Sequence, residues 1–242
     1  CTWTRERVEF TGNSAPGDGR AIYAYYVTLI DCKVTNNYCG PTGNPHGGAI
    51  YIGGEAHIER TLIANNSAPS TGGGIALRAF LPTPPTLTLI DSVISGNTSN
   101  GDAALQFLPG GCVVNAYGCL FDGNRGVLSS AWGTDSATFE NCTFTNSVTY
   151  GVFRWGSGAG TLNLVNCTLA NNTGASTVAG GISRFGGTVN MMNTIVAYNT
   201  GGGAANINGQ VVSQGYNLVT PNDFVAWAGD TTGNIYNANP ML

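Results

Sequence analysis

Small and large apolar residues alternate with polar ones in a seven-residue pattern that returns along nearly the whole chain. The clearest copy runs from Asn166 to Asn172, with a small residue at Cys167, a large apolar residue at Leu169 and asparagine at its end. Successive copies lie 23 to 31 residues apart, a period typical of solenoid proteins. The eight copies are 7–13, 31–37, 60–66, 91–97, 118–124, 141–147, 166–172 and 193–199.

The spacing inside each copy predicts a short β-strand. The second position is small and the fourth is large and apolar in every copy, and alternate residues of a strand share one face. A second short strand precedes the first, with inward positions such as Leu162 and Leu164. The corner between the two strands holds Asp, Asn or Gly in most copies, the residue types that tolerate a left-handed backbone, although one copy has Arg60 there.

Glycine-rich runs introduce a third strand in several repeats, at 47–52, 72–77 and 180–182. Three short strands per repeat, joined by corners and without a helical segment, predict an all-β solenoid: a parallel β-helix of about eight rungs. Adjacent rungs of such a coil lie ~4.8 Å apart. We expect a single domain over 1–242, with regular rungs over 1–199 and an irregular C-terminal rung or cap over 200–242.

The last position of each copy is interpreted as a structural ladder of asparagines. Stacked side-chain amides hydrogen-bond from rung to rung and satisfy backbone groups at the bend. One copy has Ser147 at this position instead. The predicted ladder residues are Asn13, Asn37, Asn66, Asn97, Asn124, Asn172 and Asn199.

Charged residues are scarce in this sequence. They make up 9% of the chain, the net charge is −4, and Lys33 is the single lysine. Nucleic acid is therefore not an expected partner, because phosphate contacts need clustered Lys and Arg. No apolar run approaches the ~18 residues that cross a membrane as a helix. We expect no cofactor and no metal.

The seven cysteines divide into two groups. The small inward position of the repeat holds Cys32, Cys119, Cys142 and Cys167. Side chains stacked in this way point in the same direction, which suits the disulfide torsion of about 90° badly. We therefore favour buried thiols that act as small apolar residues over disulfides. Outside this column lie Cys1, Cys39 and Cys112, whose spacing is not that of a zinc site.

These repeats resemble the right-handed β-helix repeats of the pectate-lyase-like superfold. The segment from Asn193 to Asn199, followed by 213–218 and 239–242, is similar to large bacterial surface proteins with such repeats, including polymorphic outer-membrane-protein-like ones. The resemblance implies a right-handed coil that is extracellular or at the cell surface of a bacterium or archaeon. It also implies that polysaccharide lyases and hydrolases share the fold, and a fold does not fix a function.

One acid–imidazole cluster is a candidate catalytic site. Glu55, His57 and Glu59 lie close together in the sequence, and His57 and Glu59 flank the inward position Ile58, so both should face outward. A lyase needs a base and a hydrolase needs paired carboxylates. We interpret the cluster as a solvated face, and keep a catalytic role as the alternative.

A second candidate is a row of arginines and aromatic residues at the ends of the third strands. Arginine binds carboxylates with two hydrogen bonds, and aromatic faces stack on sugar rings. If the strands align, the row forms either a glycan-binding surface or a packing surface for another protein. Its members are Arg78, Phe80, Arg154, Trp155, Arg184 and Phe185.

The sequence favours a non-enzymatic function. The ends of a solenoid expose strand edges and core, so we expect self-association, or contact with neighbouring domains of a longer chain, through these ends. The first hypothesis is a structural or adhesive protein, as a filament subunit or a segment of a surface rod. The alternatives are a polysaccharide lyase or glycoside hydrolase acting on an acidic glycan, and a glycan-binding module.

Overall fold

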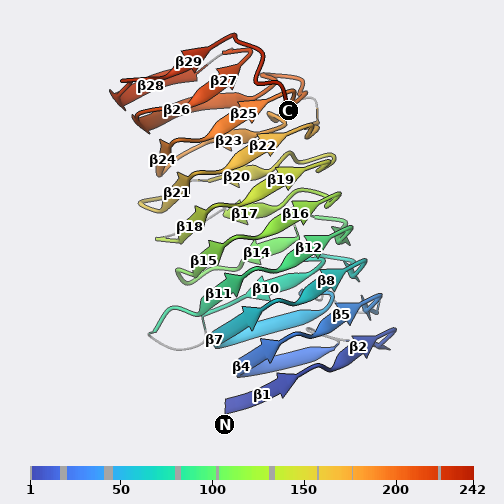
Figure 1. The fold of residues 1–242 in the computed structure, drawn as a ribbon. Coiled ribbons are helices and arrows are strands. Elements are labelled where there is room, and N and C mark those ends of the chain that lie inside the picture. The colour runs from blue at the N-terminus through green and yellow to red at the C-terminus, as the bar shows by residue number, and fades with distance from the viewer. Residues whose placement is uncertain are drawn as a thin grey trace.

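The chain forms one long stack of β-strand turns in a computed structural model, which describes residues 2–16, 21–40, 46–79, 83–101, 104–130, 134–156, 158–175, 177–222 and 225–242. Figure 1 shows the turns rising from the N-terminus to the C-terminus, each strand lying beside its counterpart in the next turn. Within the described residues there is no α-helix. The predicted all-β parallel solenoid is confirmed.

Three sets of stacked strands form the walls of the coil. The largest sheet contains β1 (Thr2–Glu6), β4 (Ile22–Ile30), β7 (Ile50–Glu59), β10 (Ile75–Leu77), β14 (Leu105–Phe107), β17 (Leu128–Ser130), β20 (Phe153–Trp155), β23 (Ile182–Arg184), β26 (Ile207–Gln214), β24 (Thr188–Met192), β21 (Thr161–Val165), β18 (Ser136–Glu140), β15 (Val113–Tyr117), β11 (Thr86–Ile90) and β28 (Val225–Asp230). It covers two walls of the coil, because the long strands β4, β7 and β26 run through both.

The second sheet carries the repeated motif. Its strands, in stacking order, are β2 (Glu9–Thr11), β5 (Lys33–Thr35), β8 (Leu62–Ala64), β12 (Val93–Ser95), β16 (Leu120–Asp122), β19 (Thr143–Thr145), β22 (Thr168–Ala170), β25 (Ile195–Ala197), β27 (Leu218–Thr220) and β29 (Ile235–Tyr236). The first eight coincide with the eight predicted copies. The last two add turns inside 200–242, where the pattern predicted an irregular rung.

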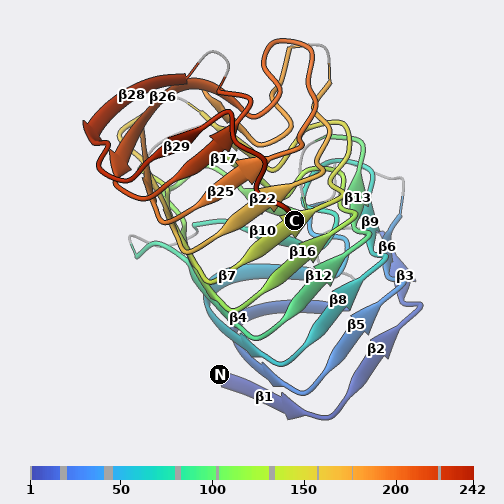
Figure 2. The same cartoon turned by 45° about the horizontal axis from the view of Figure 1, so that its top comes forward.

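A small third sheet follows the asparagine position of the first turns. It consists of β3 (Ser14–Ala15), β6 (Tyr38–Cys39), β9 (Ser67–Ala68) and β13 (Thr98–Ser99), which lie side by side along one edge of the coil in Figure 2. The strands in all three sheets pair in parallel, so each turn repeats the backbone path of the turn before it.

The core is a set of columns that run along the axis. The inward positions of the repeat stack on each other, as in the pairing of Phe121 with Phe144. These two rings lie parallel, with centroids 4.9 Å apart, and Phe139 and Phe153 pack against Phe144 edge-on. The inward positions of the repeated strand are buried in successive turns from Val34 to Val219, and the predicted core is confirmed.

Two left-handed corners turn the chain in each repeat. The predicted corner has positive φ throughout, including Asp31 at 52° and Arg60 at 45°. A second corner, which the sequence analysis missed, immediately precedes the ladder position. It has positive φ at Asn36, Gly96 and Tyr198 among others. Its signal was present in the sequence, because most of its members are Gly or Asn, which accept this backbone conformation.

The asparagine ladder is confirmed. Asn66 Oδ1 accepts hydrogen bonds from the backbone N–H and the side-chain amide of Asn37, each at 2.9 Å, and Asn66 Nδ2 donates to Val34 O at 2.8 Å. The pattern is the same from Asn66 to Asn97, and these side chains are fully buried. Each amide therefore satisfies polar groups of two turns that water cannot reach.

The ladder extends further than predicted and has one gap. After Asn199, Asn206 Oδ1 accepts the next pair of hydrogen bonds and Asn206 Nδ2 donates to Pro221 O at 2.8 Å. At the gap, the backbone N–H of Ser147 still donates to Asn172 Oδ1 at 2.9 Å. The hydroxyl of Ser147 is buried and has no hydrogen-bond partner in the described part of the chain.

The thiol interpretation is also confirmed for the cysteines that the structure describes. All six are buried and form no disulfide with one another, whereas Cys1 lies outside the described residues. Cys167 Sγ lies 3.3 Å from the carbonyl oxygens of Phe139 and Val165, so the thiol bonds to backbone inside the core. Burial raises the pKa of Cys112 to about 12, which keeps this group protonated.

Completing the ladder should stabilise the fold. We expect Ser147→Asn to raise the free energy of unfolding by about 1 kcal/mol, because the new amide supplies the acceptor found in the neighbouring ladder positions. Asn97→Ala should lower it by roughly 1–3 kcal/mol, because Asn66 loses its acceptor. Chemical denaturation followed by circular dichroism measures both changes.

The matched control for this prediction is Ser147→Ala. Removal of a hydroxyl that has no partner should leave the unfolding midpoint nearly unchanged. A Ser147→Asn protein that is destabilised as much as Asn97→Ala would show that the ladder cannot pass through this turn.

Candidate functional site

The acid–imidazole cluster lies on the outward side of the large sheet, as predicted. Glu55, His57 and Glu59 alternate along β7 with the fully buried Ala56 and Ile58. Glu55 is exposed, and His57 and Glu59 are half-buried. The sheet therefore brings the three predicted residues to one surface.

Aromatic residues that the sequence analysis did not select lie beside this cluster. Tyr26 of β4 pairs with Glu55 of β7, and Thr28 pairs with His57. Tyr26 is 42% exposed and Tyr23 is 63% exposed. We call Tyr23, Tyr26, Glu55 and His57 the lateral patch.

Three hollows meet at Tyr26. One of about 170 Å³ is lined by Tyr26, Thr28, Glu55 and His57. A second, of about 370 Å³, adds Pro84 to Tyr26 and Glu55. A third, of about 390 Å³, extends from Tyr26 towards the first turn. Tyr26 is therefore accessible from several sides, with a carboxylate and an imidazole within the same surface depression.

A β-bulge shapes the lateral patch. Ala24 pairs with Ile52 and Tyr26 with Glu55, so two residues of β7, Gly53 and Gly54, lie opposite the single residue Tyr25 of β4. A Cβ atom on Gly54 would lie 2.5 Å from Tyr25 O, so this position has room only for glycine. Bulges redirect side chains in this way.

The tyrosines of the patch are held by one another. The rings of Tyr23 and Tyr51 stack in parallel with centroids 5.2 Å apart, and Tyr51 is fully buried. Tyr25 and Tyr26 meet edge-on at 5.4 Å. The exposed rings are therefore oriented before any ligand arrives, which lowers the entropy lost on binding.

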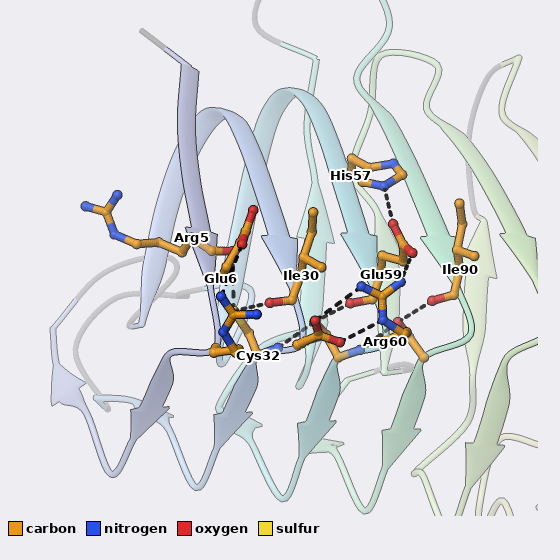
Figure 3. A network of polar contacts seen from close by, with 12 residues as sticks. Arg5, Glu6, Ile30, Cys32, His57, Glu59, Arg60 and Ile90 are labelled. Atoms are coloured by element: carbon orange, nitrogen blue, oxygen red, sulfur yellow. Dashed lines mark hydrogen bonds and ion pairs between the residues drawn. The ribbon is translucent and has the colours of Figure 1, made fainter.

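A network of charges continues from the patch along the same surface (Figure 3). His57 Nε2 lies 3.4 Å from Glu59 Oε2, and Glu59 also pairs with Arg60. Arg60 Nε bonds to Asp31 Oδ1 at 2.7 Å and Arg60 Nη2 to Asp31 Oδ2 at 3.2 Å. The carboxylate of Glu59 is thus neutralised by a fixed cation. Glu55 makes no ion pair with the residues that the structure describes.

The predicted row of arginines and aromatic residues does not form. Trp155 is buried and packs edge-on against Phe107, with ring centroids 6.5 Å apart. Arg154 pairs in register with Ser183, whereas Arg184 pairs with Trp155, so the two arginines are out of line by one residue. The alignment that the row requires is therefore not present between β20 and β23, and the three residues of β20 provide too little alternation to show from the sequence which side chains face outward.

The remaining members of the row are scattered. Arg184 is half-buried and donates to Gly187 O from Nε and Nη2, at 2.9 and 2.6 Å. Arg78 is exposed and Phe185 is 57% exposed, whereas Phe80 lies outside the described residues. A binding role for Arg78 and Phe185 stays a prediction.

One buried carboxylate was also missed by the sequence analysis. Asp135 is 1% exposed, accepts a hydrogen bond from Cys112 N at 2.8 Å and another from Ser130 Oγ at 2.7 Å. Burial raises its pKa above the ordinary value, against these two hydrogen bonds. The side chain satisfies the donors of its own corner, which is a structural role.

Neither metal-ligand groups nor membrane helices stand out in the described residues. They contain no group of three or more His, Cys, Asp and Glu side chains placed to hold a metal ion. No helix in that part of the chain has the length and hydropathy to span a membrane.

The family assignment agrees with the observed geometry. A family model described as the right-handed β-helix region matches residues 6–224. The chain therefore belongs to the right-handed β-helix family, which confirms the predicted resemblance to this fold. No curated protein and no solved structure matches the chain.

The Asp31–Arg60 pair predicts a measurable titration. The hydrogen bonds from Arg60 hold the pKa of Asp31 below its usual value. A carboxylate whose folded pKa is depressed stabilises the fold above the unfolded pKa, and this contribution is lost as the pH falls through the folded pKa. We expect Arg60→Gln to raise the pKa of Asp31 towards its ordinary value, as measured by NMR of the carboxyl carbon.

Lys33→Gln serves as the control, since Lys33 is an exposed cation that pairs with Glu9 at 2.6 Å. The titration of Asp31 should be the same in this variant as in the wild-type protein. Because the Arg60 pair is exposed, Arg60→Gln should change the stability very little. An unchanged Asp31 titration in Arg60→Gln would contradict the pairing.

Proposed function

We propose that this protein is a non-catalytic adhesive β-helix, extracellular or at the surface of a bacterial or archaeal cell, that binds carbohydrate through the lateral patch. The observation that carries the proposal is the exposure of Tyr26 beside the hollows that Glu55 and His57 line, with Tyr23 in the adjoining hollow. An aromatic wall with a few polar groups is typical of a ligand site. Aromatic rings stack on the apolar faces of sugars, and carboxylate and imidazole groups bond to hydroxyls.

The pairing of Glu59 favours binding over catalysis. Its carboxylate contacts Arg60 and His57, and Arg60 also holds Asp31. A general base is more effective when its pKa is tuned close to the working pH, and a general acid must carry a proton. A carboxylate bonded to a guanidinium is held in one position, which suits a role in orienting a ligand.

A glycan-binding experiment tests the proposal. The protein is screened on a glycan array, and the affinity of the best ligand is then measured by calorimetry. Tyr26→Ala should weaken binding about fivefold or more, because truncation of a central aromatic contact costs more than about 1 kcal/mol. Tyr117→Ala is the matched control, because Tyr117 is a 38% exposed tyrosine of the same sheet that does not line the hollows around Tyr26.

Two results would overturn this function. Equal losses in Tyr26→Ala and Tyr117→Ala would separate binding from the lateral patch. Release of new reducing or unsaturated sugar ends from the bound glycan would identify an enzyme, the alternative that the fold alone leaves open.

A further inference from the structure

A second hollow lies beside the small third sheet. It is lined by the residues that come directly after the ladder asparagines. These residues lie on β6, β9 and β13 and in the next turn of the coil. Ser67 N donates to Asn37 O, Thr98 N to Asn66 O, and Arg125 N to Asn97 O, at 2.9 to 3.0 Å. The four side chains in successive turns are Tyr38, Ser67, Thr98 and Arg125. They therefore form a column along the axis, about 14 Å from the first to the last at ~4.8 Å per turn.

The chemistry of this hollow changes along its length. Its volume is about 280 Å³. Tyr38, which is 39% exposed, stands at one end and Arg125 at the other, with the hydroxyls of Ser67 and Thr98 and the amide of Asn100 between them. No carboxylate lines it within the described residues. We call this hollow the Arg125 groove.

The arginine at the end of the groove is fixed by an aromatic ring. The guanidinium carbon of Arg125 lies 5.5 Å from the centroid of the Tyr150 ring, and that of Arg154 lies 5.6 Å from the same centroid. Arg125 makes no ion pair with the residues that the structure describes, and its Nε is buried without a hydrogen-bond partner among them. A planar guanidinium that lines a hollow and has no ion pair there matches a carboxylate.

We propose that the Arg125 groove binds a short oligosaccharide that carries a single carboxylate sugar at one end. The carboxylate bonds to Arg125, the hydroxyl groups of the sugar bond to Ser67, Thr98 and Asn100, and a neutral ring at the other end stacks on Tyr38. A polyuronate fits less well, because it would place further carboxylates near Tyr38 and Ser67, where the described lining has no cation. The Arg125 groove shares no residue with the lateral patch.

The test compares three probes of different charge. These are 3′-sialyllactose, which carries one terminal carboxylate sugar, lactose, its neutral part, and hexagalacturonate, a polyanion. Binding to the whole protein is measured by ligand-observed NMR and calorimetry, at low and high salt. We expect 3′-sialyllactose to bind more tightly than lactose and hexagalacturonate, with an affinity that falls as the salt concentration rises.

Substitutions then assign the binding to the groove. Arg125→Gln should weaken 3′-sialyllactose binding about tenfold to a hundredfold, the range expected for a charge-assisted hydrogen bond pair. Tyr38→Ala should weaken both 3′-sialyllactose and lactose. Lys33→Gln, which removes one exposed cation elsewhere, should bind as the wild-type protein does, and circular dichroism verifies that each variant is folded.

Several outcomes would overturn the proposal, and they differ from those that would overturn the lateral patch. Equal affinity for 3′-sialyllactose and lactose would show that the carboxylate is not recognised. Tighter binding of hexagalacturonate would contradict a single-anion site. Binding that survives Arg125→Gln but is lost in Tyr26→Ala would place the sugar in the lateral patch, whereas loss in Arg125→Gln alone supports the Arg125 groove even if the lateral patch binds nothing.

Discussion

Hydrogen bonding between successive turns is the constraint on which this structure depends. Each turn has few contacts of its own, so its backbone groups are satisfied by the turns before and after it. At the bend that holds the ladder, backbone N–H groups are buried and cannot bond to water. The side-chain amides of residues such as Asn66 and Asn97 accept their hydrogen bonds instead. This arrangement repeats one backbone path, and it leaves the outward positions free to vary in chemistry.

Both candidate binding surfaces arise from local departures from that repeat. On one wall, the extra glycine of β7 opposite Tyr25 shifts the register of the two strands just before Tyr26 and Glu55. On another wall, the residue that follows the ladder asparagine differs in each turn, from Tyr38 in one turn to Arg125 three turns later. The regular coil supplies rigidity and spacing, and the exceptions supply the two surfaces that we propose as binding sites. This division agrees with the general rule that function depends on sites carried by a fold.

The sequence predicted what repeats and missed what does not. The inward columns and the ladder were predictable because each recurs at the same place in successive copies, with Ser147 as the one exception in the ladder. The burial of Trp155 was not predictable, since the three residues of β20 provide too little alternation to show which side chains face inward. The lateral patch depends on a bulge that only the pairing of β4 with β7 defines. Asn206 joins the ladder from a position seven residues after Asn199, where no copy of the motif exists.

The gap in the ladder coincides with the densest aromatic packing. Ser147 interrupts the amides between the turns of β16 and β19, and the rings of Phe121 and Phe144 stack across the same two turns. This junction therefore depends more on apolar contact than its neighbours do. Apolar contacts weaken as water cools, whereas the hydrogen-bonded junctions do not share this dependence to the same degree. Cooling should therefore weaken this junction more than its neighbours, although its backbone hydrogen bonds still join the two turns.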